Sequence, residues 1–457
     1  MSVNKRHIDM SSGPLTGKII RYAIPLVLTY LLQLAFHAAD MVVIGRWGSP
    51  LSLAAIGATV PLAGLLINVM TGISTGANVL AAQYFGARNS RAMTRLVHTA
   101  IALSIAGGLL VAVLGISLSK FMVQATDVPL ESQSRSITYM VICFLGVPCQ
   151  ILYNFGCAIL RAVGDTRSPL SFLIYAGVLN VVLNMFFVIV CGMDVAGVAG
   201  ATVISQFLSA YLVIKRLQNN RGATRLILTR LRIDWESLRN ILKLGVPAGL
   251  QSGCFSISNI AIQGGINTFG VAAVAGMTAG YNVEMLLYAL VFAMHHTTIA
   301  VVGQNYGAQK YQRLIHAIYV CIGGAAVITL VSGMLFYYFS PQLIGIFNTD
   351  PEVIKFGVMR AREMFTLYFL LAFMDTSSGA LRGLGSSLLP ALSTLLGTCG
   401  LRILWVKYVF PHYHSMEGLL LTYPLSWLLV AVVNIVFLCY ICKHLSFHSQ
   451  NQVKITL

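Results

Sequence analysis

Residues 81–91 read AAQYFGARNSR, and residues 302–312 read VGQNYGAQKYQ. The two stretches share a Gln, a Gly and an Ala at the same spacing, and an offset of 221 residues (304 minus 83) separates them. The same offset separates ILRAVG (159–164) from ALRGLG (380–385). Similarity at a fixed offset indicates an internal structural repeat. We therefore expect a chain built from two halves with the same fold.

The composition of the chain indicates that both halves lie in a membrane. Hydrophobic residues fill 57% of the 457 positions and charged residues only 10%, whereas soluble domains carry about 25% charged residues. A span through roughly 30 Å of hydrocarbon needs about 20 apolar residues. Runs of about this length or more fall near 19–45, 51–80, 96–119, 137–160, 170–191, 195–216, 240–263, 270–300, 314–339, 364–381, 388–410 and 417–442. The sequence predicts an all-α polytopic membrane protein with twelve transmembrane helices, the first of them uncleaved.

The spans divide into two sets of six around a long basic link. We expect an N-terminal six-helix lobe at 1–216, a basic cytoplasmic linker at 217–239 and a C-terminal six-helix lobe at 240–457. Because each half has an even number of spans, both halves enter the membrane from the same side and the repeat is parallel. Its pseudo-two-fold axis then runs along the membrane normal, as in some transporters.

The formal net charge of +16 is explained by membrane topology without a nucleic-acid partner. With the N-terminus inside, most Lys and Arg residues fall in cytoplasmic links, and the link at 217–239 is the richest. An excess of this kind is typical of cytoplasmic loops. We expect a multi-pass protein of the cell (inner) membrane, with both termini in the cytoplasm and a monomeric state.

Four stretches spread along the chain carry a family resemblance. They are ADMVVIGRWG (39–48), AILRAVGDTRSP (158–169), GVAGATVISQ (197–206) and VVGQNYGA (301–308). In these stretches, and in its two sets of six spans, the chain resembles the multidrug and toxin extrusion (MATE) family, DinF-like branch. The resemblance covers nearly the whole chain. It implies a secondary active antiporter that exports amphipathic, often cationic compounds in exchange for H⁺ or Na⁺.

The resemblance also implies an ion-coupling site in the N-terminal half. The DinF-like branch has an Asp on its first helix, an Asn and an Asp one turn apart on its fifth, and a Thr early on its sixth. The matching positions in this sequence are Asp40, Asn180, Asn184 and Thr202. The second acid of the family is therefore an Asn here, which removes one negative charge from the site.

The residues themselves support part of this interpretation. An acid in an apolar span is costly, so Asp40 is expected to face a cavity or a partner such as Arg46. Asn180 and Asn184 are four positions apart and share a helical face, although packing between helices is an alternative for both. One carboxylate in an apolar setting suits a proton carrier, and the amide and hydroxyl oxygens also suit Na⁺.

Three residues of the second half are candidates for a substrate cavity. Glu284 and Asp375 fall inside predicted spans, where a charge is expected to face the interior of the bundle. His295 and His296 follow Glu284 by about three turns, so one of them, His296 being the candidate, can share its face and shuttle protons. Structural packing is the alternative for all of them. Arg402 is either a buried ion-pair partner or the mark of a shorter span.

Pro25 and Pro247 occupy matching places in the first helix of each half. Proline removes a helical hydrogen bond and permits a kink. One hypothesis is that protonation of Asp40 biases bending of the first helix near Pro25. A static kink is the alternative.

A lipid or lipid-linked oligosaccharide flippase of the same superfamily is the alternative function. Such a protein is expected to line its cavity with basic residues that receive phosphates, whereas the clear intramembrane charges here are mostly acidic. No H-E-x-x-H, G-x-S-x-G or P-loop motif is present, so we expect no enzyme and no cofactor. The nine cysteines lie mostly alone in apolar runs, so no metal is expected beyond Na⁺ at the coupling cluster. The expected partners are a small amphipathic organic compound, H⁺ or Na⁺, and the lipid bilayer.

Overall fold

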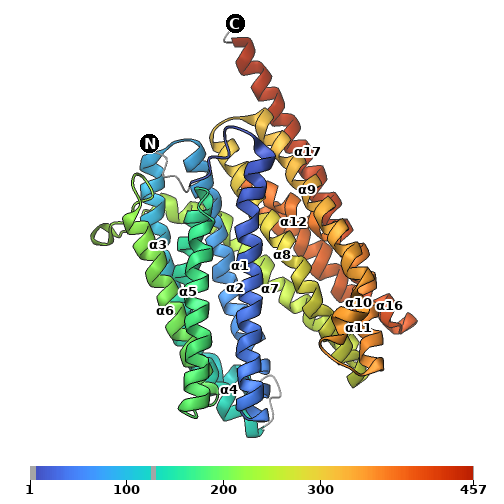
Figure 1. Cartoon of the computed structure of the whole chain (residues 1–457). Coiled ribbons are helices and arrows are strands. Elements are labelled where there is room, and N and C mark those ends of the chain that lie inside the picture. Colours follow the sequence, from blue (N-terminus) through green and yellow to red (C-terminus); the bar gives the residue numbers. More distant parts are fainter. Residues whose placement is uncertain (1–6, 125–129, 456–457) are drawn as a thin grey trace. The chain divides into compact units, whose positions relative to one another are not determined.

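The computed structural model describes residues 7–124 and 130–455, and the regular elements within these two ranges are all helices (Figure 1). The first half contains α1 (Leu15–Trp47), α2 (Pro50–Gly86), α3 (Ser90–Gln124), α4 (Leu130–Ala162), α5 (Arg167–Met185), the π turn η1 (Phe186–Val190), α6 (Val195–Asn219) and the short 3₁₀ helix η2 (Leu228–Arg230). The predicted all-α class is confirmed.

The second half repeats this order with more interruptions. It contains α7 (Trp235–Asn267), α8 (Val271–Gly307), α9 (Tyr311–Tyr338), α10 (Ser340–Gly345), α11 (Pro351–Thr366), α12 (Tyr368–Gly383), α13 (Leu388–Thr394), the π turn η3 (Leu395–Gly400), α14 (Leu401–Leu404), the π turn η4 (Trp405–Val409), α15 (Phe410–Tyr413), α16 (Met416–Leu420) and α17 (Thr422–Ile455).

Each of the twelve predicted spans coincides with helical structure. Among the described residues, nine helices are long and apolar enough to cross a membrane, and α11 with α12 makes a tenth span if the pair, bent by 52°, is counted as one. The remaining two, α2 and α7, have 37 and 33 residues, more than the roughly 20 that a span needs. The chain is therefore a multi-pass membrane protein.

One predicted boundary is corrected by the structure. The span expected at 364–381 begins earlier, because α11 starts at Pro351 and continues to Thr366 before the bend. Five charged residues between positions 352 and 363 make this stretch look like a polar link. In the structure one of them, Arg360, is buried inside the helix bundle, so it counts among the intramembrane charges.

The internal repeat is visible in the backbone. Arg88 and Gln309, which follow α2 and α8, both have a positive φ, of 53° and 57°. Gly164 and Gly385, which follow α4 and α12, also have positive φ values, of 87° and 90°. Both pairs are separated by 221 residues (309 minus 88, and 385 minus 164). The links that the two halves share by sequence therefore share an uncommon conformation.

The contacts divide the chain into two compact units. The first contains Leu28–Gly253 with the described residues up to Asp9, and the second contains Met10–Val27 and the chain from Cys254 onward. The first part of α1 thus groups with the second unit, and the first part of α7 with the first unit. The lobe boundaries at 216 and 240 stay a prediction.

The repeated stretch at 302–312 has a structural role in the second unit. The side chain of Gln304 accepts a hydrogen bond of 2.8 Å from the backbone N–H of Met10. Arg313 donates to the carbonyl oxygens of Met10, Ser12 and Gly13 at 2.8–3.1 Å. The segment before α1 is therefore fixed to the link between α8 and α9.

Within the first unit, α2 and α7 touch at their backbones. A Cβ on Gly249 would lie 2.5 Å from the carbonyl oxygen of Val69, and a Cβ on Gly245 would lie 2.6 Å from the Cα of Ile73. Gly72 and Gly76 on α2 face this contact, so each helix offers two glycines four positions apart. Small residues at this spacing allow close helix crossing in membranes.

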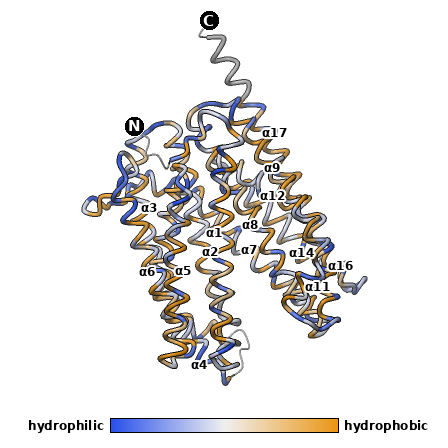
Figure 2. Tube along the Cα trace, viewed as in Figure 1, coloured by the Kyte–Doolittle hydropathy of each residue, from blue (hydrophilic) through white to orange (hydrophobic). Residues whose placement is uncertain are grey.

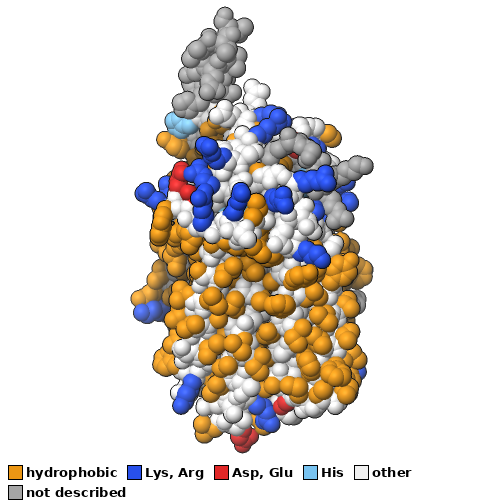
Figure 3. Space-filling view, turned by 90° about the vertical axis from the view of Figure 1, so that its left-hand side faces the viewer, with side chains coloured by type: hydrophobic (Ala, Val, Ile, Leu, Met, Phe, Trp, Pro, Cys, Tyr) orange, Lys and Arg blue, Asp and Glu red, His pale blue; other side chains and the backbone are white. Residues whose placement is uncertain are grey.

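Large apolar side chains are exposed on the outer helices of the first unit. Figure 2 shows the apolar character of these helices, and Figure 3 shows a broad apolar belt with Lys and Arg side chains gathered at one end of it. The exposed residues on α3 and α6 include Leu109, Leu110, Val113, Phe121 and Phe207. A surface of this kind faces hydrocarbon, where every backbone polar group must be satisfied within the helices.

Asp234 caps the start of α7, outside the membrane-spanning segments. Its carboxylate accepts hydrogen bonds from the hydroxyl and the backbone N–H of Ser237, at 2.7 and 2.9 Å. These bonds, the hydroxyl bond first, hold the pKa of Asp234 below its ordinary value of 3.8. The cap therefore stabilises the fold above the unfolded pKa, and its contribution is lost as the pH falls through the lower folded pKa.

Replacing Asp234 by Ala should lower the free energy of unfolding by about 1 kcal/mol at neutral pH, the usual cost of losing an N-cap. The difference from wild type should shrink below about pH 4, where the wild-type carboxylate takes up a proton. Thermal unfolding of the purified protein across this pH range measures both effects. Asp234→Asn keeps an acceptor but not the charge, so at neutral pH it should lose less stability than Asp234→Ala and should not change with pH near 4; a loss equal to that of Asp234→Ala would contradict the cap.

Candidate functional site

A polar cavity of about 440 Å³ lies inside the first unit, between α1, α4, α5 and α6. Its lining combines one acid and one histidine with several amide and hydroxyl side chains. The residues are Gln33, Phe36, His37, Asp40, Gln150, Tyr153, Asn154, Leu173, Ala176, Gly177, Asn180, Thr202, Ser205, Gln206 and Ser209.

Helical spacing places these side chains together. On α1 the lining positions run from Gln33 to Asp40 in steps of three, one and three, and on α6 they run from Thr202 to Ser209 in the same steps. Residues three and four apart share one helical face. Gly177 on α5 allows a close approach, because a Cβ there would overlap the ring of Phe36. One stripe of each helix therefore faces the cavity while the opposite stripe is apolar.

The four predicted coupling residues form one hydrogen-bonded chain. The Nδ2 group of Asn184 donates to Oδ1 of Asp40 and, at 3.3 Å, to Oδ1 of Asn180. Nδ2 of Asn180 in turn lies 3.4 Å from Oγ1 of Thr202. The hydroxyl of Thr202 donates to the carbonyl oxygen of Val198 at 3.0 Å. The structure thus brings together all four residues, whose role in coupling remains a prediction.

Asp40 has no cationic partner among the described residues. No Lys, Arg or His nitrogen lies within 4.0 Å of its carboxylate, so the pairing with Arg46 that the sequence left open does not form. Its one hydrogen-bond donor is the neutral amide of Asn184. An ionised Asp40 is therefore the uncompensated charge of an otherwise neutral polar cavity.

Several lining residues were missed by reasoning from the sequence. Gln33 and His37 lie on the same face of α1 as Asp40, and Gln206 is four positions after Thr202. Across the cavity Nε2 of Gln206 lies 3.4 Å from Oε1 of Gln150. Their helical spacing from Asp40 and Thr202 is the feature of the sequence that could have predicted their place in the cavity. Uncharged amides are common between membrane helices, so spacing alone did not single them out.

Glu284, a candidate for the substrate cavity, forms a buried ion pair in the second unit, and its role in a substrate cavity stays a prediction. Arg360 on α11 donates to Oε2 of Glu284 from Nη2 at 2.7 Å and from Nε at 3.1 Å. Both side chains are almost fully buried, with exposed fractions of 5% and 6%. The guanidinium of Arg360 also lies over the rings of Tyr281 and Tyr423, at 5.6 and 5.2 Å.

Asp375 belongs to a second network of the same unit. The hydroxyl of Tyr288 lies 3.5 Å from its Oδ2, and Nδ1 of His295 lies 2.7 Å from its backbone carbonyl oxygen. This contact places the proton of His295 on Nδ1, so Nε2 can accept from Arg382, 3.4 Å away. The histidine that contacts the acid's backbone is therefore His295. His296 packs against the rings of Phe292 and His295, at 4.5 and 5.4 Å.

The structure does not join Glu284, Asp375 and His296 into one group. Glu284 and Asp375 lie in separate networks, each with an arginine. Pro25 and Pro247 lie inside α1 and α7, and both helices continue through them. A kink at either proline stays a prediction.

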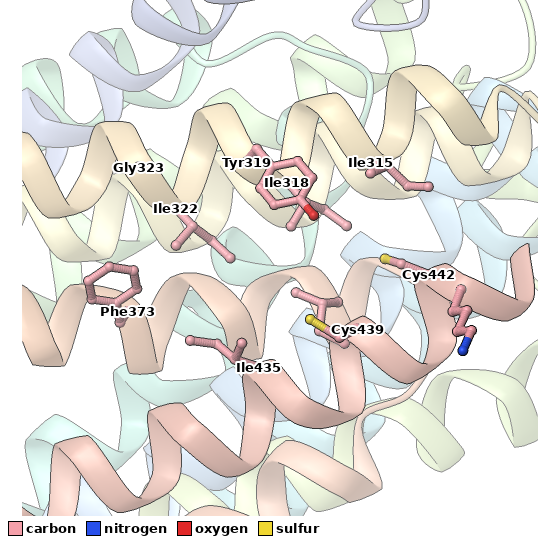
Figure 4. Close-up of a pocket in the computed structure, with 11 residues that line it drawn as sticks. Ile315, Ile318, Tyr319, Ile322, Gly323, Phe373, Ile435, Cys439 and Cys442 are labelled. Atoms are coloured by element: carbon pink, nitrogen blue, oxygen red, sulfur yellow. The ribbon is translucent and has the colours of Figure 1, made fainter. Parts of the chain in front are cut away.

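An apolar cavity of about 540 Å³ in the second unit has a different character. Figure 4 shows side chains of α9 and α17, with Phe373 of α12, around this space. Ile315, Ile322 and Ile435 are typical of its lining, and Lys443 is its one charged residue. No acid lines it, so it is not suited to holding a cation.

Repeated helical halves in a membrane, with a polar cavity inside one of the units, are typical of a polytopic membrane transporter. The chain belongs to the MatE family, whose model matches residues 25–186 and 247–406. The family resemblance seen in the sequence is thereby confirmed, and the DinF-like branch stays a prediction.

Similar proteins cover almost the whole chain. The probable multidrug resistance protein YoeA of Bacillus subtilis is 28% identical over 419 residues, which are 89% of each protein. An FAD transporter of Shewanella oneidensis is 25% identical over 453 residues, 96% of this chain and 97% of the relative. An outward-facing multidrug resistance MATE family transporter of the MOP superfamily has a TM-score of 0.91 at 22% identity, covering 97% of this chain and 99% of that one. That likeness shows the two-lobe fold of twelve helices.

Proposed function

We propose that the chain is a secondary active antiporter that exports small amphipathic organic compounds in exchange for H⁺ or Na⁺. The observation that carries the proposal is that Asp40, in the polar cavity of the first unit, has no cationic partner among the residues that the structure describes. A charge in such a place is costly unless an ion neutralises it. The names of the relatives, which include multidrug resistance proteins, support export of organic compounds.

Coupling requires that the ion and the compound favour different states of the transporter. A ligand shifts a conformational equilibrium only by its differential affinity for the two states. In the proposed cycle the ion neutralises Asp40 and stabilises the state that has released the compound. Loss of the ion restores the charge and favours the state that takes up the next compound.

The contacts of Asn184 give more support to H⁺ than to Na⁺. Its Nδ2 group points at Oδ1 of Asp40 and at Oδ1 of Asn180, so a donor occupies oxygens that a metal ion would need. A proton needs one oxygen, and Oδ2 of Asp40 accepts no hydrogen bond from the described residues. A hard cation such as Na⁺ needs several oxygen ligands at once.

The expected preference for cationic compounds has less support. It rests on Glu284 and Asp375, but Arg360 binds Glu284 directly, and Arg382 lies in the network of Asp375. The buried arginines are also an observation in favour of the flippase, since arginine binds phosphate well. We retain export of amphipathic compounds, cationic ones among them, as the proposal. A monomer in the cell membrane with cytoplasmic termini completes it.

Everted membrane vesicles test the proposal. With an acidic or Na⁺-rich lumen, the wild type should accumulate an amphipathic dye such as ethidium, and Asp40→Asn should reduce accumulation to the level without a gradient. Glu131→Gln, which changes an exposed acid of α4, is the matched control and should behave like wild type. Gradient-driven uptake that survives in Asp40→Asn would contradict the role of Asp40. Phospholipid scrambling without dye uptake under any gradient would favour the flippase.

A further inference from the structure

Another buried charge, that of Arg402 on α14, lies in the second unit. Its exposed fraction is 2%. Nε lies 3.2 Å from Oγ of Ser426, and Nη1 lies 3.3 Å from Oδ1 of Asn259. The ring of Tyr423 covers one face of the guanidinium at 4.4 Å. All of these contacts are to neutral groups.

Arg402 has no carboxylate partner among the described residues. The nearby acid is Glu284, and Arg360 already holds it with two hydrogen bonds. Arg360 and Arg402 lie over the same ring, that of Tyr423. The buried group therefore contains two arginines and one carboxylate, with an uncompensated positive charge. Burying a charge without a partner costs free energy. A bound ligand of opposite charge would remove this cost for as long as it stays bound.

The internal repeat relates this group to the cavity of the first unit. Tyr423 and Ser426 on α17 correspond to Thr202 and Ser205 on α6 at the offset of 221 (423 minus 202, and 426 minus 205). Arg402 corresponds to Asn180 at an offset of 222 (402 minus 180). The position that carries a neutral amide in the first unit thus carries a positive charge in the second.

A π turn explains the extra residue in this correspondence. Pro390 at the start of α13 still follows the offset of 221 from Pro169. The π turn η3 at Leu395–Gly400 comes next and ends two residues before Arg402. A π turn accommodates one more residue than an α-helical turn, and such turns are frequent at functional sites. A second π turn, η4, begins three residues after Arg402.

We propose that Arg402 anchors an anion site in the second unit, which binds a carboxylate, sulfonate or phosphate group of a transported compound. The proposal rests on the proposed function as an exporter and names the chemical class of part of its substrates. Anionic and zwitterionic amphipathic compounds then join the cationic ones.

The present contacts of Arg402 are weak enough to be exchanged. Distances of 3.2 and 3.3 Å are at the long end for N–H···O hydrogen bonds. Nη2 donates to no acceptor among the described residues. An anion offers shorter, charge-assisted bonds to two nitrogens of a guanidinium at once. Exchange of two neutral acceptors for one anion would also compensate the buried charge.

Three naphthalene probes of different charge test this site by binding alone. They are 2-naphthoate, its methyl ester and 2-naphthylmethylammonium, and a compound that binds the folded state raises the unfolding temperature of the purified protein. Naphthoate should raise it in a saturable way, and the ester should not. Arg402→Gln should weaken naphthoate binding by roughly tenfold or more, the effect of losing a charged hydrogen-bond partner. Lys407→Gln, an exposed cation on the same segment, should bind like wild type.

The outcomes separate this inference from the proposed antiport. Because no gradient is used, naphthoate binding through Arg402 would stand even if the Asp40→Asn experiment failed. Equal naphthoate binding in wild type and Arg402→Gln, or equal binding of the ester, would overturn the anion site. Binding of sulfate without binding of naphthoate would overturn the proposal that the site binds an organic compound, and would show that it binds only an inorganic anion. If Arg402→Gln does not fold, Arg402→Lys keeps the charge without the planar fork; it should bind naphthoate less tightly than wild type, and equal binding would count against the site.

Discussion

Replacing Glu284 by Gln should lower the free energy of unfolding by about 3–5 kcal/mol, the usual cost of breaking a buried ion pair from one side. The stability is lost because the variant keeps the buried arginines without the carboxylate that pairs with one of them. Arg360 would keep its charge with an exposed fraction of only 5%, and Arg402 beside it has no carboxylate partner among the described residues. Two buried guanidiniums would then stack against Tyr423 with no negative charge to offset them.

Unfolding of the purified protein in detergent measures this effect, and two further variants define it. Glu284→Gln combined with Arg360→Met removes both charges and should recover most of the lost stability, because an apolar replacement of a buried pair is often neutral. Glu236→Gln breaks an exposed pair with Arg95, 3.4 Å apart, and should change the free energy of unfolding by less than about 1 kcal/mol. Similar losses in Glu284→Gln and Glu236→Gln would show that burial does not control the energy of this pair.

Replacing Gly249 by Leu should disrupt the crossing of α2 and α7 and cost about 3 kcal/mol or more. A Cβ at this position would already lie 2.5 Å from the carbonyl oxygen of Val69, which belongs to the backbone of the other helix. A side chain can rotate away from a new neighbour, but a helix backbone must move as a whole. The cost should therefore reach the upper end of the range for overpacked cores.

Gly253 provides a matched control on the same helix. It lies four positions after Gly249, and a Cβ there would meet nothing within 4 Å. Gly253→Leu should leave the protein folded and can add helix propensity of roughly 0.5–1 kcal/mol. Folded yield and unfolding temperature of the two variants measure the difference. A folded Gly249→Leu variant as stable as Gly253→Leu would mean that α2 and α7 do not require contact at their backbones.

The sequence predicts the helical spans and the two-fold repeat of this molecule well, because both can be recognised along the chain without knowing which helices pack together. The stretch at 302–312 and the prolines of the two first helices needed only comparison along the chain. Asp40, Asn180, Asn184 and Thr202 were found because the family resemblance joins positions that are far apart, and the structure places them in one hydrogen-bonded chain.

The charge pairing of the second unit could not be predicted in the same way. Glu284 and Arg360 are 76 positions apart, and α11 carries enough charge to resemble a link. Arg402 was visible, but its partners Ser426 and Asn259 are neutral residues with no pattern that points to it. An ion pair between α8 and α11 requires the packing of those helices, which hydropathy does not specify.

The single carboxylate that lines the polar cavity of the first unit also determines how the membrane potential acts on transport. If Asp40 carries one proton inward in each cycle, export of a monovalent cation moves no net charge, so only the pH difference drives it. Export of a neutral compound moves one charge inward, and export of a monovalent anion moves two. Each charge adds about 2.3 kcal/mol of driving force per 100 mV. Compounds bound through Arg402 would therefore respond most strongly to the voltage.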